Sequence, residues 1–219
     1  MHLLPNKSSV FSLDGNGLTL PPLTKLKMIL PVVAYGAPVL RKVCEEITPG
    51  YSELDKLIAD MWDTLYNSNG VGLAAPQINK PIRLFIVDTI QVVEDFNDED
   101  KRKYPNEEPI KQIFLNARKI EDTGDLWPYN EGCLSIPKVR EDIQRTRKVR
   151  LRYLDENFVE HEAEFHGITA RVIQHEYDHI EGKLFIDYLS QLKRRLIKKK
   201  LEDISAGKVK TDYRMLFPK

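Results

Sequence analysis

The segment His175-Glu176-Tyr177-Asp178-His179 most constrains how this chain can fold, because it forms an H-E-x-x-H pattern. Residues four apart lie on one face of a helix. If the segment is helical, both imidazoles can therefore reach one metal ion. The glutamate beside the first histidine is then placed to move protons for a water on the metal. The pattern predicts a helix, a metal ion and a third ligand elsewhere in the chain.

A helical wheel supports the predicted helix. Within roughly 60° of Ile173 lies an apolar stripe that faces a core, formed by Ala170, Tyr177, Ile180 and Leu184. The two histidines lie on another face, beside Val172, and Glu176 falls between that face and the stripe. Gly182 is typical of the residue that follows a helix C-terminus. With only 5 histidines in the chain, two at ligand spacing favour a metal site over a solvated face.

The composition limits which partners the whole chain attracts. Lys+Arg and Asp+Glu both number 33, so there is no overall attraction to nucleic acid or an anionic membrane. No apolar run approaches the ~20 residues of a membrane span. The two cysteines, Cys44 and Cys133, form no disulfide framework, which fits a reducing compartment. We expect a cytoplasmic globular protein without a membrane partner.

The chain divides into three segments. Residues 1–27 contain three prolines and several Ser, Asn and Gly residues, and they lack the apolar run of a secretory signal. We expect an irregular N-terminal extension there. Residues 28–190 carry regular apolar patterns and form the predicted catalytic domain. Residues 191–219 form a predicted basic helix and tail.

The catalytic domain is predicted to be α+β. Apolar residues recur at helical spacing in residues 51–67, which predicts a helix. Residues 149–154 and 158–165 flank an acidic turn and predict a hairpin. Residues 94–109 are mostly polar or charged and predict a solvated loop. We therefore expect mainly antiparallel sheets packed around a central helix that carries H-E-x-x-H, followed by a C-terminal helix.

Residues 70–77 form a second candidate segment, with the sequence GVGLAAPQ. Its first six residues match G-x-G-x-x-A, but a predicted helix precedes them and Pro76 opposes a helix after them, which argues against a dinucleotide site. The glycines instead let another backbone approach, so the segment can pair with an extended peptide as an added strand. The uncharged amide of Gln77 suits either an oxyanion or an ordinary loop hydrogen bond.

Three residues compete for the place of the third ligand. Metzincins continue the pattern to a third histidine, and here Gly182 fits but Phe185 stands at the histidine position. Glu202 matches the downstream carboxylate of other metallopeptidases, but it follows a basic run. Cys133 lies in a turn bounded by Gly and Pro, and thiolates bind borderline metals strongly. The alternative for a lone cysteine is a small buried hydrophobe, which is its more usual role. On chemistry alone Cys133 is still the best of the three candidates, because a thiolate binds such metals strongly.

Three segments, in order, resemble the signature motifs of the peptide deformylases: GVGLAAPQ at residues 70–77, EGCLS at residues 131–135 and QHEYDH at residues 174–179. The start at residues 28–31 is similar as well, and the resemblance spans about residues 28–190. It implies a metallohydrolase that removes the formyl group from N-formylmethionine at the N-terminus of newly synthesised proteins and releases formate.

The resemblance also implies the roles of individual residues. Glu176 would act as general base and then acid while water attacks the formyl carbon, and Gln77 and the Leu134 backbone N–H would hold the oxyanion. The ion would be Fe(II) in the cell, or Zn(II) or Ni(II) in purified protein. The implied metal ligands are Cys133, His175 and His179.

The implied substrate is an N-formylmethionyl nascent peptide. It would lie along Gly70, Val71 and Gly72 as an added strand, with the methionine side chain near Val172. Arg171 stands one turn before the first histidine, where an apolar residue is expected, and this changes the charge of the predicted pocket rim.

Two alternative functions are compatible with the sequence, and one of them depends on the basic helix predicted after residue 190. Its lysines and arginines form either a solvated face or a contact with ribosomal RNA. A non-catalytic ribosome binder is disfavoured because Glu176 stands beside two histidines at ligand spacing. A general metallopeptidase remains the alternative enzyme, and cleavage of unmodified peptides would distinguish it.

Overall fold

The computed structural model describes residues 28–104 and 107–218, so the predicted extension at residues 1–27 lies outside the described residues. Short 3-10 turns occur at Pro38–Arg41, Ala75–Ile78 and Phe185–Tyr188. In chain order the helices and strands are β1 Val32–Val33, α1 Leu54–Asn67, β2 Gly72–Ala74, β3 Leu84–Asp88, α2 Ile90–Glu94, α3 Asp98–Lys103, β4 Lys111–Cys133, β5 Ile136–Leu154, β6 Glu160–His166, α4 Gly167–Ile180, α5 Gln191–Ser205 and β7 Met215–Leu216.

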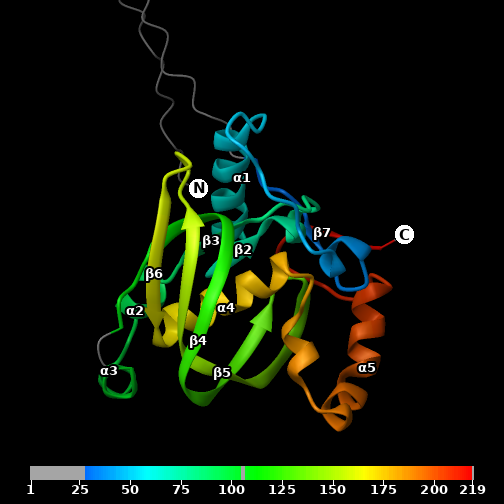
Figure 1. The fold of residues 1–219 in the computed structure, drawn as a ribbon. Helices are drawn as coiled ribbons and strands as arrows, with labels where there is room; N and C mark the ends of the chain where they lie inside the picture. Colours follow the sequence, from blue (N-terminus) through cyan, green and yellow to red (C-terminus); the bar gives the residue numbers. More distant parts are fainter. Residues whose placement is uncertain (1–27, 105–106, 219) are drawn as a thin grey trace, which may run out of the picture.

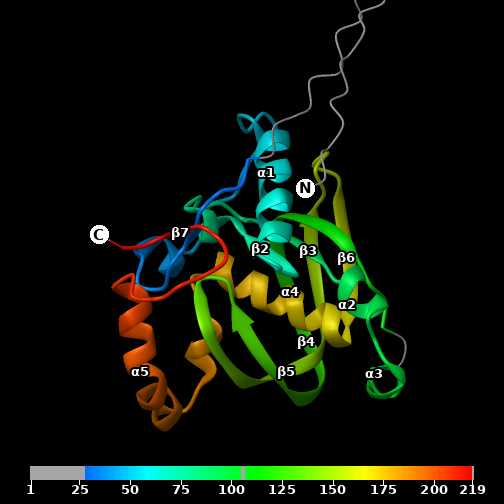
Figure 2. The ribbon, with the colours of Figure 1, turned by 180° about the vertical axis from the view of Figure 1, so that it is seen from behind.

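A five-stranded antiparallel sheet wraps around α4. Its strand order is β2-β3-β4-β5-β6, and a separate two-stranded sheet pairs β1 with β7. Helix α4 contacts β2, β3, β5 and β6, and it crosses these strands in both views (Figures 1 and 2). Helix α5 lies to one side (Figure 1). The predicted α+β fold, with antiparallel strands around the H-E-x-x-H helix and a C-terminal helix, is confirmed.

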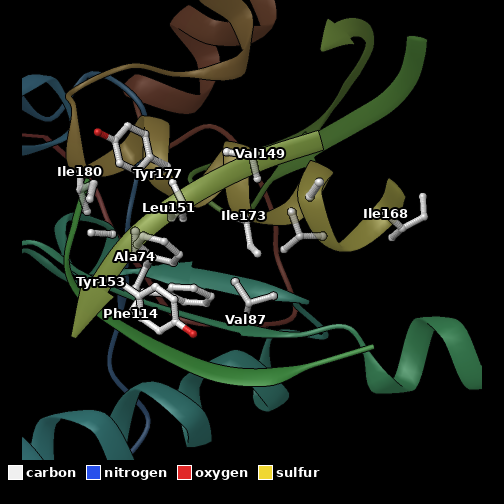
Figure 3. Packing of buried hydrophobic residues seen from close by; sticks show 14 of the residues in the cluster. Ala74, Val87, Phe114, Val149, Leu151, Tyr153, Ile168, Ile173, Tyr177 and Ile180 are labelled. Carbon is white, nitrogen blue, oxygen red and sulfur yellow. The ribbon is translucent and has the colours of Figure 1, made fainter. Parts of the chain in front are cut away.

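The apolar stripe of α4 forms the centre of the core (Figure 3). Ile173 and Ile180 have no exposed surface, and burial of each contributes roughly 1.5–3 kcal/mol. Leu184 was expected in this stripe but packs in another cluster. The reason is Gly182, whose left-handed φ of 69° follows the helix end. The stripe residues in the core are Ala170, Ile173, Tyr177 and Ile180.

The long hairpin of β4 and β5 brings a cysteine to α4. These strands have 23 and 19 residues, and only Leu134 and Ser135 separate them. Cys133 pairs with Ile136 across this turn. Register shifts interrupt the pairing of the two strands at several points, and such bulges bend a strand pair. A residue 42 positions before His175 in sequence can therefore end beside α4.

Residues 94–104 and 107–109, the described parts of the predicted loop, contain more regular structure than the sequence predicts. Residues 98–103 form α3, whose N-cap Asn97 accepts hydrogen bonds from two backbone N–H groups. Acidic residues in its first turn and basic ones in its last complement the helix dipole. Glu107 then accepts hydrogen bonds from the N–H groups of Ile168 (2.9 Å) and Thr169 (2.7 Å). The acidic segment thereby caps the N-terminus of α4.

Two other predicted elements are present. The helix expected at residues 51–67 is α1, and the hairpin expected at residues 149–165 is formed by β5 and β6. Among the described residues, no helix is long and apolar enough to cross a membrane.

Candidate metal centre and catalytic cleft

Two elements bring the candidate ligands together. Helix α4 carries His175 and His179, and the end of β4 carries Cys133. One donor atom from each of the three lies within 4.8 Å of the others. The Cys133 Sγ and the His179 Nε2 are 3.2 Å apart. This cluster is the one group of three or more His, Cys, Asp or Glu donors with metal-holding geometry in the described part of the chain.

The donor set fits a divalent metal ion. One thiolate and two imidazoles leave a fourth tetrahedral position for water or substrate, as in catalytic zinc-type sites. Thiolate and imidazole also suit iron, zinc and nickel. Phe185, which stands where metzincins have a third histidine, instead stacks beside His175 with ring centroids 6.0 Å apart. Within the described residues the third donor is therefore a thiol from another element.

Glu131 orients the first histidine. Its Oε2 accepts a hydrogen bond from His175 Nδ1 at 2.9 Å, which leaves the Nε2 lone pair for a metal. Burial raises the pKa of the Glu131 carboxyl, but the His175 hydrogen bond and the charge of Arg145 outweigh burial and hold that pKa well below its usual range. The carboxylate is therefore a permanent acceptor for the histidine.

Two buried arginines hold Glu131 in turn. Arg145 donates to both of its oxygens, at 2.7 and 3.1 Å, and also to Asp178 Oδ2 at 2.6 Å. Arg171 donates to Glu131 Oε1 at 3.0 Å. The network ties β4, β5 and α4 together beneath the metal ligands. Buried charges need such partners, because an unpaired one costs several kcal/mol.

Arg171 was expected to alter the rim of the substrate pocket. Arg171 does line the cleft, but its side chain is almost fully buried, with 2% exposed. The guanidinium lies 4.5 Å from the centre of the Trp127 ring and donates to the Trp127 carbonyl at 2.7 Å. The positive charge is therefore matched by Glu131 and an aromatic face rather than offered to the rim.

Glu176 lies buried against the glycine segment. Burial raises the pKa of its carboxyl to about 7, which suits a group that must both accept and donate a proton near neutral pH. Its Oε2 is buried and has no hydrogen-bond partner among the described residues. A Cβ on Gly72 would lie 2.5 Å from its Oε1. Only glycine lets β2 pass this close to the carboxylate.

Gln77 points its amide at the cysteine. Its Oε1 accepts from the Ala74 N–H at 2.8 Å, which directs Nε2 towards Cys133 Sγ (3.5 Å) and Ser135 Oγ (3.4 Å). The side chain is 1% exposed. Leu134, next to the cysteine, occupies the tight turn between β4 and β5. The Gln77 amide therefore contacts both the candidate ligand Cys133 and the turn that follows it.

A cleft of about 490 Å³ opens over the cluster. Every residue predicted for the site lines it except His179, which is buried behind. Among the described strands, β2 is at the edge of the sheet and pairs only with β3, so its other edge can accept a further strand. The G-x-G-x-x-A match opens no α-helix, because Gly72 begins β2 instead. Further lining residues that the sequence analysis did not identify are Val92, Tyr129, Val139, Ile168 and Tyr213.

An antiparallel sheet around an H-E-x-x-H helix, with a thiol as third donor and a buried carboxylate beside it, defines a metal-dependent hydrolase. A family profile described as "Polypeptide deformylase" matches residues 29–195. The chain belongs to this family, whose members use a divalent metal and remove the N-terminal formyl group from proteins.

Relatives and solved structures agree with the family assignment. A peptide deformylase of Flavobacterium psychrophilum is 53% identical over 88% of this chain and 99% of its own length. One from Cytophaga hutchinsonii is 51% identical over 87% of this chain and 98% of its own. The crystal structure of a Legionella pneumophila peptide deformylase has a TM-score of 0.68 and 33% identity, covering 82% of this chain and 97% of that chain.

Proposed function

We propose that this chain hydrolyses the formamide bond of N-formylmethionyl peptides on newly synthesised proteins and releases formate. The observation that carries the proposal is the buried Glu176 carboxylate beside three metal-donor atoms and the Gln77 amide. Glu176, Gln77, Cys133 and His175 line one cleft, and the two metal candidates among them form a donor cluster with His179. This supports the roles of proton carrier, oxyanion donor and metal-binding set.

Cys133, His175 and His179 would hold the ion, and we propose Fe(II) in the cell, with Zn(II) or Ni(II) in purified protein. Bound there, a divalent cation supplies Lewis-acid polarisation and lowers the pKa of a water molecule. Glu131 keeps His175 in the tautomer that ligation requires. Metal analysis of anaerobically purified protein tests the identity of the ion.

Glu176 takes a proton from the attacking water and later gives it to the departing amine. Its pKa near 7 allows both steps. As the formyl oxygen gains negative charge, the Gln77 Nε2 and the Leu134 N–H donate hydrogen bonds to it. The C–N bond then breaks, which leaves formate and a free N-terminal amine.

The peptide would lie along Gly70, Val71 and Gly72 as a strand added to the free edge of β2. The methionine side chain would enter the part of the cleft lined by Val172 and Ile168. A formyl hydrogen is smaller than any acyl carbon, so the close packing of Gly72 against Glu176 favours rejection of acetyl groups.

The test is formate release from formyl-Met-Ala-Ser, with the unformylated peptide as the comparison. Glu176→Ala should keep a full equivalent of metal while kcat falls by roughly 10²–10⁴. Glu164→Ala, which removes an exposed carboxylate on β6, is the matched control and should retain activity. Near-normal turnover by metal-replete Glu176→Ala would refute the role of Glu176. Cleavage of the unformylated peptide would favour the metallopeptidase alternative.

We also propose a ribosome contact through α5. Leu192 and Leu196 are 67% and 73% exposed, and Arg195 and Lys199 lie at helical spacing on the same face. An exposed apolar pair among basic residues fits a surface of RNA and protein. Arg195→Glu combined with Leu196→Ser should weaken co-sedimentation with ribosomes at low salt. Lys80→Glu, far along the chain, is the control, and equal binding of all forms would contradict the contact.

A further inference from the structure

The C-terminal tail, defined as residues 208–217, returns from α5 to the catalytic domain. Gly207, with a φ of 71°, follows the end of α5. Strand β7 then pairs in parallel with β1, with Val32 opposite Met215. The Val32 N–H donates to the Arg214 carbonyl at 2.9 Å. The tail is thereby fixed to the opposite end of the described chain.

Apolar packing holds the tail as well. Three of its side chains pack against the cluster that contains Leu201 and Ile204 of α5: Val209, Met215 and Phe217. Gly36 packs closely beside both ends of the tail, because a Cβ there would lie 2.3 Å from Ser205 Oγ and 3.2 Å from Pro218 Cγ. The tail is therefore anchored on both sides of residues 210–213.

Between these anchors the tail forms one wall of the catalytic cleft. Residues 210–213 line the cavity together with Gln77, Cys133 and Glu176. The family profile ends at residue 195, so this wall comes from outside the matched region. Nothing in the three sequence motifs assigns it a role.

Tyr213 makes the decisive contact. Its hydroxyl donates to the Leu134 carbonyl at 2.7 Å. The next carbonyl, that of Ser135, accepts from the Tyr35 N–H at 2.8 Å. Both carbonyls of the two-residue turn are therefore held by groups from outside the hairpin. The Leu134 carbonyl shares its peptide plane with the Ser135 N–H, and only the two backbone torsions of Leu134 separate that plane from the Leu134 N–H. Holding the carbonyl therefore restricts the direction of the Leu134 N–H through these two torsions.

We infer that Tyr213 is a positioning residue for deformylation, because it fixes the turn whose Leu134 N–H faces the developing oxyanion. The inference rests on the proposed function, which assigns that donor. Loss of one oxyanion donor costs roughly 10²–10³ in kcat in other enzymes. If Tyr213 no longer holds the turn, the Leu134 N–H remains but its direction is no longer fixed. We therefore expect kcat to fall by less than it does when a donor is removed altogether.

Tyr213→Phe tests the inference while keeping the ring and its packing. We expect kcat for formyl-Met-Ala-Ser to fall about tenfold and KM to change less than about twofold, because the lost alignment acts in the transition state. Tyr66→Phe is the matched control. Its hydroxyl donates to Asp88 at 2.6 Å, outside the cleft, so kcat and KM should stay at wild-type values.

Hydrogen exchange supplies a readout that needs neither metal nor turnover. In metal-free protein, the backbone amides of residues 131–136 should exchange at least about threefold faster in Tyr213→Phe than in wild type or Tyr66→Phe. An unchanged kcat in Tyr213→Phe would overturn the inference. A fall in kcat/KM caused only by a rise in KM would overturn it as well. If wild type releases no formate, the proposed function fails, and exchange still decides whether Tyr213 holds the turn.

Discussion

Replacing Glu131 with glutamine should destabilise the protein and weaken its metal site together. The carboxylate accepts four hydrogen bonds, two at each oxygen, from Arg145, Arg171 and His175. Glutamine keeps only one acceptor oxygen, so two of these bonds are lost whichever way the amide faces. Its NH₂ group then points at two further donors.

The size of the effect follows from these contacts. Each charge-assisted bond contributes roughly 1.5–3 kcal/mol, and breaking a buried ion pair costs about 3–5 kcal/mol. Asp178 continues to pair with Arg145, which places the expected loss at the lower end, about 3 kcal/mol. Because His175 also loses its orienting carboxylate, zinc affinity should fall by roughly 10- to 100-fold.

Urea unfolding of metal-free protein measures the stability change without a contribution from bound metal. Competition with a chromogenic chelator measures zinc affinity. Glu141→Gln is the control, because Glu141 pairs with Lys193 at the surface at 3.0 Å and such pairs contribute about 0–1 kcal/mol. A free energy of unfolding within about 1 kcal/mol of wild type, together with unchanged zinc affinity, would refute the reasoning.

Three further predictions concern the cleft and its thiols. Gly72→Ala should lower kcat/KM about 100-fold, because its Cβ would displace the Glu176 carboxylate; a loss under about threefold would contradict this close packing. Iodoacetamide at pH 8 should label Cys133 but not Cys44 in metal-free protein. Burial raises the pKa of Cys44 to about 11, which leaves about one thiolate in a thousand, and mass spectrometry of tryptic peptides decides between the two. The Fe(II) form should lose activity in air faster than the Ni(II) form through oxidation of Cys133, and equal decay would argue against the thiolate as the sensitive group.

The sequence was most informative where the chemistry is local. The spacing of His175 and His179 fixed a helix and a shared face, and α4 has both. Cys133 was the best third donor on chemistry, but only the ordered motifs paired it with the histidines. The structure brings it to the helix through a long bent hairpin, which periodicity does not describe.

What the sequence could not predict depends on contacts between distant elements. The burial of Arg171 requires Glu131 and Trp127 from β4, so its charge appeared to belong to the pocket rim. Helix α3 has no apolar stripe. Its N-cap and charged residues define it, and in the sequence the same polar residues are equally typical of a solvated loop. Tyr213 has no local pattern at all, because its role arises from the pairing of β7 with β1.

The pairing of β1 with β7 has a consequence during synthesis of this protein. Strand β7 is translated after every other described element, so β1 waits for its partner until nearly the whole described chain has left the ribosome. The sheet around α4 and the three metal donors can assemble earlier, because residues up to 180 contain them. In a nascent copy, the three candidate metal donors can therefore meet before the Tyr213 wall of the cleft exists. Among the described elements, the last strand to be made thus brings residues 210–213 to the wall of the cleft.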